Sequence, residues 1–303
     1  MKLKSYSLCR KKLGVLAALA LLALICPSRP AQADIIVQNG DTIAFLGDSI
    51  TAFGAQTPGG YVNLVISGLA ANGVKATAIP AGVSGNTSRD MLARLTRDVI
   101  SKKPTWMTLS CGVNDVWHGV NGVDLPTYKT NIGSILDQVT AANIKPVILT
   151  STMIHELPTD ALNVKLADYN AFLVQTASDR KLPLADLNSE MQAEIAADLK
   201  ANGGPPPGGL WLTVDGVHMN PDGNIMMATG ILKAFGLSDA QIATARQSWL
   251  DIPASTLLSP RVFITLRQYQ ALSVAAAAKK ISVLDYLGQL AANTLPAGAA
   301  PAH

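Results

Sequence analysis

Cysteine is scarce in this chain, and its placement excludes a fold held together by disulfides. The 303 residues include three cysteines, of which Cys9 and Cys26 lie in the first 33 residues and Cys111 lies much further along. If the first segment is removed, Cys111 has no partner for an intramolecular disulfide. The fold then depends on its hydrophobic core, for which the remaining residues, about 270, are ample.

Charge is also sparse, and the small positive balance belongs to one end of the chain. Six of the 24 Lys and Arg residues and none of the 21 Asp and Glu residues lie at positions 1–33, so positions 34–303 carry a net charge of −3. That part lacks the dense stripe of Lys and Arg that neutralises phosphates. Nucleic acid is therefore not expected as a partner.

The first 33 residues have the pattern of a cleavable signal peptide. Basic residues precede an apolar run at 13–25, and the small-x-small sequence Ala-Gln-Ala occupies 31–33. A run of about thirteen apolar residues is too short for a bilayer core, which needs roughly 20. We expect cleavage before Asp34 and export to the periplasm or the extracellular space. No later stretch is long and apolar enough to predict a membrane span.

Between residues 41 and 236, short apolar runs rich in β-formers alternate with longer segments of helical periodicity. The runs predict strands at 42–46, 76–79, 106–110, 146–150 and 182–186. The periodic segments predict helices at 61–71, 88–100, 128–142, 161–180 and 221–235. Such alternation indicates a three-layer α/β/α fold with a parallel, flavodoxin-like sheet of about five strands. Ligands bind such sheets beyond the carboxyl ends of the strands.

Two regions depart from this alternation. Residues 201–209 contain three prolines and four glycines, which predict a loop. Beyond residue 236 the strands stop, and helices are expected at 239–250 and 260–290. The predicted organisation is a signal peptide at 1–33, an α/β domain at 34–237 and a helical C-terminal extension of unknown role at 238–303.

A serine follows the first predicted strand directly. The sequence Gly47-Asp48-Ser49-Ile50 places Ser49 on the strand-to-helix turn at the ligand-facing edge of the sheet. There its hydroxyl is exposed, and its own N–H, near a helix N-terminus, can face a developing oxyanion. Asp48 and Ser49 are equally suited to cap the next helix. This tetrapeptide alone does not decide between a nucleophile and a cap.

The loops after the second and third strands supply hydrogen-bond donors. Gly85 lies in the loop at 81–87, and Asn114 lies in the sequence Gly-Val-Asn-Asp at 112–115. Because neighbouring parallel strands end at the same edge, the Gly85 amide and the Asn114 side chain should join the Ser49 amide around one oxygen. Glycine and asparagine are also common turn residues, so each signal is weak by itself.

Two pairs of an aspartate and a histidine compete for the role of general base. Asp215 precedes His218 by three residues, a spacing that lets the carboxylate fix the imidazole tautomer. Asp115 precedes His118 by the same spacing, so spacing alone does not choose between them. Because His118 shares its loop with the expected oxyanion donor, we favour His218 and expect Asp115 to cap a helix or brace a loop. His155 follows a strand without an acid at that spacing, and we expect it and His118 at the rim or in structural roles.

The four blocks GDSI, VSGNT, GVND and DGVH stand in the order and spacing of the SGNH hydrolase (GDSL-like lipase/esterase) family, which this chain resembles from about residue 41 to 236. The resemblance implies Ser49 as the nucleophile, Gly85 and Asn114 as oxyanion donors with the Ser49 amide, and Asp215 and His218 as the rest of a triad. Isoleucine stands where the family name has leucine. A G-x-S-x-G elbow is absent, which disfavours the usual α/β-hydrolase lineage.

The sequence therefore predicts an exported serine esterase that works through an acyl-enzyme intermediate. Metal and nucleotide motifs are absent, so no cofactor is expected. Trp117, His118 and Trp211 mix aromatic and polar groups near the site, which favours a sugar face and a short-chain acyl ester such as an acetylated carbohydrate. Both tryptophans would equally suit a core. Lysophospholipid or thioester hydrolysis remains an alternative, as does a non-catalytic carbohydrate-binding or surface protein, and the sequence leaves the oligomeric state open.

Overall fold

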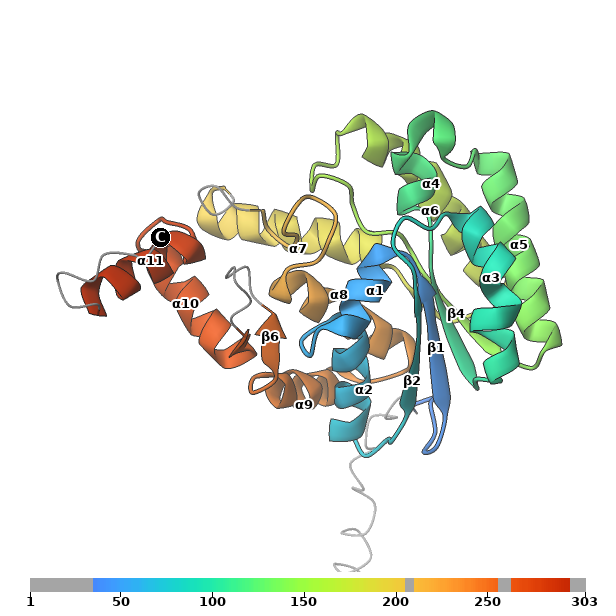
Figure 1. Cartoon of the computed structure of the whole chain (residues 1–303), viewed down its shortest axis with the longest axis horizontal. Helices are drawn as coiled ribbons and strands as arrows, with labels where there is room; N and C mark the ends of the chain where they lie inside the picture. The colour runs from blue at the N-terminus through green and yellow to red at the C-terminus, as the bar shows by residue number, and fades with distance from the viewer. Residues whose placement is uncertain (1–34, 205–209, 256–262, 295–303) are drawn as a thin grey trace, which may run out of the picture. The chain divides into compact units, whose positions relative to one another are not determined.

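The computed structural model describes residues 35–204, 210–255 and 263–294 (Figure 1). The expected signal peptide at 1–33 lies outside the described residues, as does most of the proline-rich segment, 205–209. No helix within the described ranges is long and apolar enough to cross a membrane.

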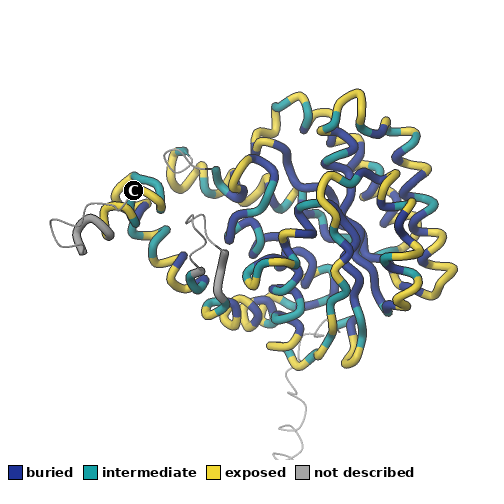
Figure 2. Tube along the Cα trace, viewed as in Figure 1, coloured by how far each residue is buried: buried dark blue, intermediate teal, exposed yellow. Residues whose placement is uncertain are grey.

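A parallel sheet of five strands lies at the centre of the α/β region, in the order β2-β1-β3-β4-β5. The strands are β1 (Thr42–Gly47), β2 (Thr77–Gly82), β3 (Trp106–Ser110), β4 (Lys145–Leu149) and β5 (Leu184–Ala185). This order confirms the predicted flavodoxin-like sheet. The inner strands β1, β3 and β4 are buried along almost their whole length because helices cover both faces (Figure 2).

Helices form a layer on each face of the sheet (Figure 1). On one face lie α1 (Ser49–Gln56), α2 (Tyr61–Ala71) and α8 (Pro221–Ala234). On the other lie α3 (Ser88–Asp98), α5 (Leu125–Ala141) and α6 (Ala161–Arg180). Between β3 and α5 the chain forms the short helix α4 (Val113–Trp117) and the 3-10 turn η2 (Gly119–Asn121), and η1 (Ile100–Lys102) follows α3. The arrangement confirms the predicted three layers.

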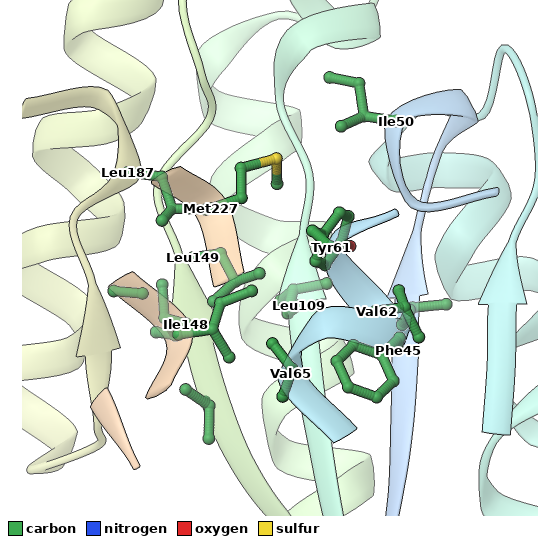
Figure 3. Close-up of a cluster of buried hydrophobic side chains, with 14 of the residues drawn as sticks. Phe45, Ile50, Tyr61, Val62, Val65, Leu109, Ile148, Leu149, Leu187 and Met227 are labelled. Atoms are coloured by element: carbon green, nitrogen blue, oxygen red, sulfur yellow. The ribbon is translucent and has the colours of Figure 1, made fainter. Parts of the chain in front are cut away.

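The core between the sheet and its α2/α8 layer is apolar and closely packed (Figure 3). Phe45, Leu109 and Ile148 of the sheet meet Val65 of α2 and Met227 of α8, and all five side chains are buried. Burial of each such side chain stabilises the fold by about 1.5–3 kcal/mol. This core fixes the strands whose carboxyl ends carry the predicted site.

The helix α7 (Leu187–Asn202) was not predicted, and it overturns part of the loop expected at 201–209. The helix continues through the first two residues of that segment and ends at Gly203, whose φ of 74° is left-handed. Glycine adopts this conformation without strain, which makes it a common residue at helix ends. Helix α7 therefore ends at the first glycine of the segment and not at its start.

The region after residue 236 begins with a helix that packs one face against the α/β domain. Helix α9 (Asp239–Trp249) packs on α2, where the fully buried Trp249 donates from its indole nitrogen to the carbonyl oxygen of Leu64 at 3.0 Å. Beyond it, the prediction of helical structure throughout 260–290 was wrong in part. The strands β6 (Pro253–Ser255) and β7 (Phe263–Thr265) pair antiparallel, and two helices follow, α10 (Leu266–Ala278) and α11 (Val283–Thr294).

Candidate active site

Three side chains from distant parts of the sequence form one hydrogen-bonded chain. The Oγ of Ser49 lies 2.9 Å from Nε2 of His218, and Nδ1 of the same ring lies 2.6 Å from Oδ2 of Asp215. Ser49 opens α1 directly after β1, whereas Asp215 and His218 lie just before α8. The structure thus brings together the serine, histidine and aspartate singled out from the sequence.

The turn from β1 into α1 explains how Ser49 is presented. Asp48 caps the helix, because its Oδ1 accepts from the Ile50 N–H at 2.9 Å, and Ser49 is left free to face the imidazole. A Cβ at Gly47 would lie 2.0 Å from Oγ1 of Thr51, so only glycine fits this turn. Of the two residues that could cap the helix, Asp48 does so, and the Ser49 hydroxyl lies against the imidazole.

A tight turn holds Asp215 and His218 in one geometry. Oδ1 of Asp215 accepts from the backbone N–H groups of Val217 and His218 at 3.0 and 2.8 Å. Gly216, which lies between Asp215 and Val217, has a φ of 95°. Partial burial opposes ionisation of Asp215, but hydrogen bonds from the His218 ring and from this backbone outweigh it, so the pKa of Asp215 lies below its usual range. An ionised Asp215 favours a proton on Nδ1 of His218, which leaves Nε2 able to accept one from Ser49.

The His218 ring is also held by an aromatic contact. Phe53, one turn along α1 from Ser49, lies with its ring centroid 4.9 Å from that of His218, and its side chain is 45% exposed. The tilted contact restricts the orientation of the imidazole. Phe53 was not singled out from the sequence, where nothing marks it as a neighbour of His218.

Asn114 links the loops at the ends of β1 and β2. Its Nδ2 donates to the backbone carbonyl of Asn86 at 3.1 Å and lies 3.5 Å from Oδ2 of Asp48. Gly85, next to Asn86, has a φ of 79°, and its α-carbon faces open space. These contacts place Asn114 and the Gly85 loop beside the turn that carries Ser49.

A buried arginine, not recognised from the sequence, ties this edge of the sheet together. Arg94 of α3 donates to the carbonyl oxygens of Gly47 and Ala81, at the ends of β1 and β2, each at 2.8 Å. Its Nε also donates to Oδ1 of Asn86 at 2.6 Å. Arg94 thus fixes both strand ends and the loop that contains Gly85. Its i,i+4 ion pair with Asp98 completes its set of partners.

Two buried carboxyl groups lie under the site. Burial raises the pKa of Asp48 to about 6, against the lowering effect of the Ile50 N–H. Burial also raises the pKa of Asp115, whose oxygens accept from the Ser88 N–H at 3.0 and 3.1 Å. The expectation that Asp115 braces a structural element is confirmed, because it ties α4 to the start of α3. Its carboxylate is directed to α3 and not to His118.

Two further histidines, His118 and His155, are placed differently from each other. His118 is half-buried, and its backbone N–H donates to the Asn114 carbonyl at the end of α4. His155 is exposed and has an acidic partner that the three-residue spacing did not reveal, because its Nδ1 lies 3.1 Å from Oδ2 of Asp160. Its backbone N–H donates to the carbonyl of Gly216 at 2.7 Å, so His155 lies against the turn that carries Asp215.

The two tryptophans proposed for substrate contact also differ. Trp117 is 39% exposed, and its ring centroid lies 5.1 Å from that of His155. Trp211 is partly buried and packs against the core, while its backbone N–H donates to Glu156. Trp117 and His155 together present an exposed aromatic and polar surface next to the turn of Asp215. Across the described residues, no group of three or more His, Cys, Asp or Glu side chains could hold a metal ion.

Comparison with protein families and known proteins gives consistent matches to ester-cleaving enzymes. The model of the GDSL-like lipase/acylhydrolase family matches residues 45–224. The acetylxylan esterase of Geobacillus stearothermophilus is 28% identical over 222 residues, which cover 66% of this chain and 96% of that protein. The thioesterase 1/protease 1/lysophospholipase L1 of Escherichia coli K12 is 25% identical over 193 residues, which cover 64% and 82% of the two chains.

Solved structures give the same result. A catalytic mutant of the Geobacillus stearothermophilus acetylxylan esterase superposes with a TM-score of 0.59 at 26% identity, covering 67% of this chain and 97% of that one. The acetyl xylan esterase AlAXEase superposes with a TM-score of 0.56 at 29% identity, covering 64% and 98%. The catalytic mutants of the Geobacillus enzyme replace a serine, an aspartate and a histidine, and its aspartate and histidine stand three positions apart.

Proposed function

Because the chain belongs to the GDSL-like lipase/acylhydrolase family and is an ester-hydrolysing enzyme, we propose that it is an exported serine esterase that removes short acyl groups, acetyl above all, from carbohydrate. The observation that carries the proposal is the chain of hydrogen bonds from Ser49 through His218 to Asp215, with distances of 2.9 and 2.6 Å. A serine attacks esters when a histidine accepts its proton and an acid orients that histidine.

In the proposed reaction, Oγ of Ser49 attacks the ester carbonyl and its proton passes to Nε2 of His218. The N–H groups of Ser49 and Gly85 and the side-chain amide of Asn114 donate to the oxyanion, each contributing roughly 2.7–4 kcal/mol to the lowering of the barrier. The imidazolium then protonates the departing alcohol oxygen, which leaves an acetyl ester on Ser49. Water, deprotonated by the same histidine, releases acetate and restores the hydroxyl.

A carbohydrate as the alcohol part is supported by the surface beside the triad. A sugar ring can stack on the exposed face of Trp117 while its hydroxyls bond to His155, whose ring is already oriented by Asp160. The Geobacillus stearothermophilus relative that this chain matches over 96% of that protein's length is an acetylxylan esterase. The export part of the proposal rests on the signal-peptide pattern of residues 1–33.

Hydrolysis of lysophospholipid or thioester substrates is the second candidate, favoured by two observations. The Escherichia coli relative is named for these activities. In addition, the exposed apolar side chains include Phe53 against His218 and Trp117 against His155. A long acyl chain gains roughly 0.8 kcal/mol per buried methylene, so a continuous apolar surface here would favour long chains.

Hydrolysis rates across a series of p-nitrophenyl esters from acetate to palmitate separate the two candidates. The proposal expects kcat/KM to be highest at acetate and acetate to be released from acetylated xylan. The matched control is Ser49→Ala, which should lose both activities while it keeps the thermal unfolding temperature of the native protein. A maximum at long chains without acetate release would reject the carbohydrate esterase and support the lipid hydrolase. Failure of the native protein to cleave any ester would reject both.

A further inference from the structure

The segment after β4 contains a sharp bend, the His155–Glu156 corner, and Glu156 takes no part in the proposed reaction. His155 and Glu156 are consecutive non-glycine residues with left-handed backbones, with φ values of 58° and 54°. Residues other than glycine disfavour this conformation because of their Cβ, and it persists only where the surrounding structure holds it. Asn163 of α6 supplies one anchor, since its side chain bonds both the N–H and the carbonyl of Ile154.

The second anchor is the buried carboxylate of Glu156, which is 6% exposed. Its Oε2 accepts from the Trp211 N–H at 2.6 Å. Its Oε1 accepts from the Leu212 N–H at 2.8 Å and from the hydroxyl of Thr213 at 2.6 Å. All three donors come from consecutive residues that end two positions before Asp215. Buried carboxylates with charge-assisted hydrogen bonds of this kind hold geometry firmly.

The bonds continue from this anchor into the turn itself. Oγ1 of Thr213, which donates to Glu156, also accepts from the Gly216 N–H at 3.1 Å. The Gly216 carbonyl in turn accepts from the His155 N–H at 2.7 Å. A Cβ at Gly216 would lie 3.1 Å from the His155 ring, so corner and turn are in close contact. The strained corner and the turn that carries Asp215 and His218 therefore hold each other.

We propose that Glu156 is a positioning residue that fixes the turn of Asp215 and His218, so that Nε2 of His218 stays within hydrogen-bond distance of Ser49. The proposal rests on the proposed function of these three residues. Glu156 acts through this turn, because its three donors are the Trp211 N–H, the Leu212 N–H and the Thr213 hydroxyl. Misplacement of a catalytic group by about 1 Å is enough to slow a reaction by about 10²-fold.

The first test replaces Glu156 by glutamine, which has the same shape but presents an amide N–H where the native oxygen accepts one. With p-nitrophenyl acetate, Glu156→Gln should lower kcat about 10- to 100-fold and leave KM within about twofold, because the turn carries the base and not the acyl site. The matched control is Asp186→Asn. Asp186 also accepts three hydrogen bonds, from Thr150 and Ser189, but at the start of α7. The kcat of Asp186→Asn should stay within about twofold of that of the native protein.

A second arm separates positioning from general loss of structure. If Glu156 acts through His218, the glutamine variant should cost no further activity in a His218→Ala background, whereas a structural defect would lower the residual activity there too. Thr213→Val, which removes one donor and leaves the Glu156 carboxylate in place, should lower kcat in the same direction by about 3- to 10-fold. This variant keeps the test decisive if Glu156→Gln does not fold.

The outcomes distinguish this inference from the proposed function. A native protein without esterase activity, or an active Ser49→Ala, rejects the proposed function. With an active native protein, the inference alone is overturned by a Glu156→Gln kcat within twofold of native, by an equal loss in the His218→Ala background, or by an unchanged kcat in Thr213→Val when the glutamine variant fails to fold.

Discussion

Replacement of Asp215 by asparagine should disable the site while the fold stays intact. In the native protein Oδ2 of Asp215 accepts from Nδ1 of His218 at 2.6 Å, and Oδ1 accepts from the backbone of the same turn. Asparagine keeps the shape, but its amide nitrogen in the Oδ2 position would donate to Nδ1. The ring would then carry its proton on Nε2, where it cannot accept the proton of Ser49.

The size of the effect follows from the exposure of Asp215. In a serine protease with a buried triad, the corresponding change lowers kcat by about 10⁴-fold. The Asp215 side chain is 50% exposed, so water can replace part of its stabilisation of the imidazolium. We therefore expect a loss of about 10²–10³-fold in kcat, equivalent to about 3–4 kcal/mol at 1.36 kcal/mol per tenfold.

The assay is steady-state hydrolysis of p-nitrophenyl acetate, with thermal unfolding measured on the same samples. The chain offers a matched control, because Asp160 pairs with Nδ1 of His155 at 3.1 Å without contact to Ser49. Asp160→Asn should keep kcat within about threefold of native. A kcat loss below tenfold in Asp215→Asn, or equal losses in both variants, would refute the assignment of Asp215 as the residue that orients the base.

Three further predictions follow from the contacts around the site. Asn114→Ala should lower kcat by about 10²–10³-fold with little change in KM, since its amide binds the oxyanion and not the ester; a change in KM alone would contradict this. Arg94→Met should lower the free energy of unfolding by about 2–4 kcal/mol in urea titrations, because the buried carbonyls of Gly47 and Ala81 lose their donor; a change below 1 kcal/mol would contradict it. Because burial raises the pKa of Asp48 to about 6, the folded state binds more protons than the unfolded state between about pH 4 and 6, so this group lowers stability as the pH rises through that window. Asp48→Asn should flatten that part of the pH profile of unfolding free energy, and an unchanged profile would contradict the assignment.

The parts of the fold with local signals could be predicted from the sequence. Helices α2 and α6 have the predicted bounds, because their apolar residues recur at helical spacing and Asp160 caps α6. The parallel sheet followed from the alternation of strands and helices. A helix after Ser49 was expected from the strand-to-helix turn, but its bounds were not predicted, and α1 runs from Ser49 to Gln56.

The residues that support the site could not be predicted in the same way. Ser49, Asp215 and His218 are marked by short motifs, whereas Arg94 and Glu156 act on backbone groups from distant parts of the chain. No local sequence pattern predicts which backbone carbonyl or N–H group a long charged side chain will hydrogen-bond. The strands β6 and β7 were missed for the same reason, since each is only three residues long and pairs with the other across a connecting segment.

Covalent labelling of Ser49 tests the central claim most directly. A fluorophosphonate probe should react with one serine of the native protein, and mass spectrometry of the digested product should place the adduct on Ser49, with labelling abolished in Ser49→Ala and strongly slowed in His218→Ala. The distance of 2.9 Å between Nε2 of His218 and Oγ of Ser49 predicts this dependence on the histidine. Labelling of Ser84 or Ser110 in place of Ser49, or labelling that is unaffected by His218→Ala, would contradict the account.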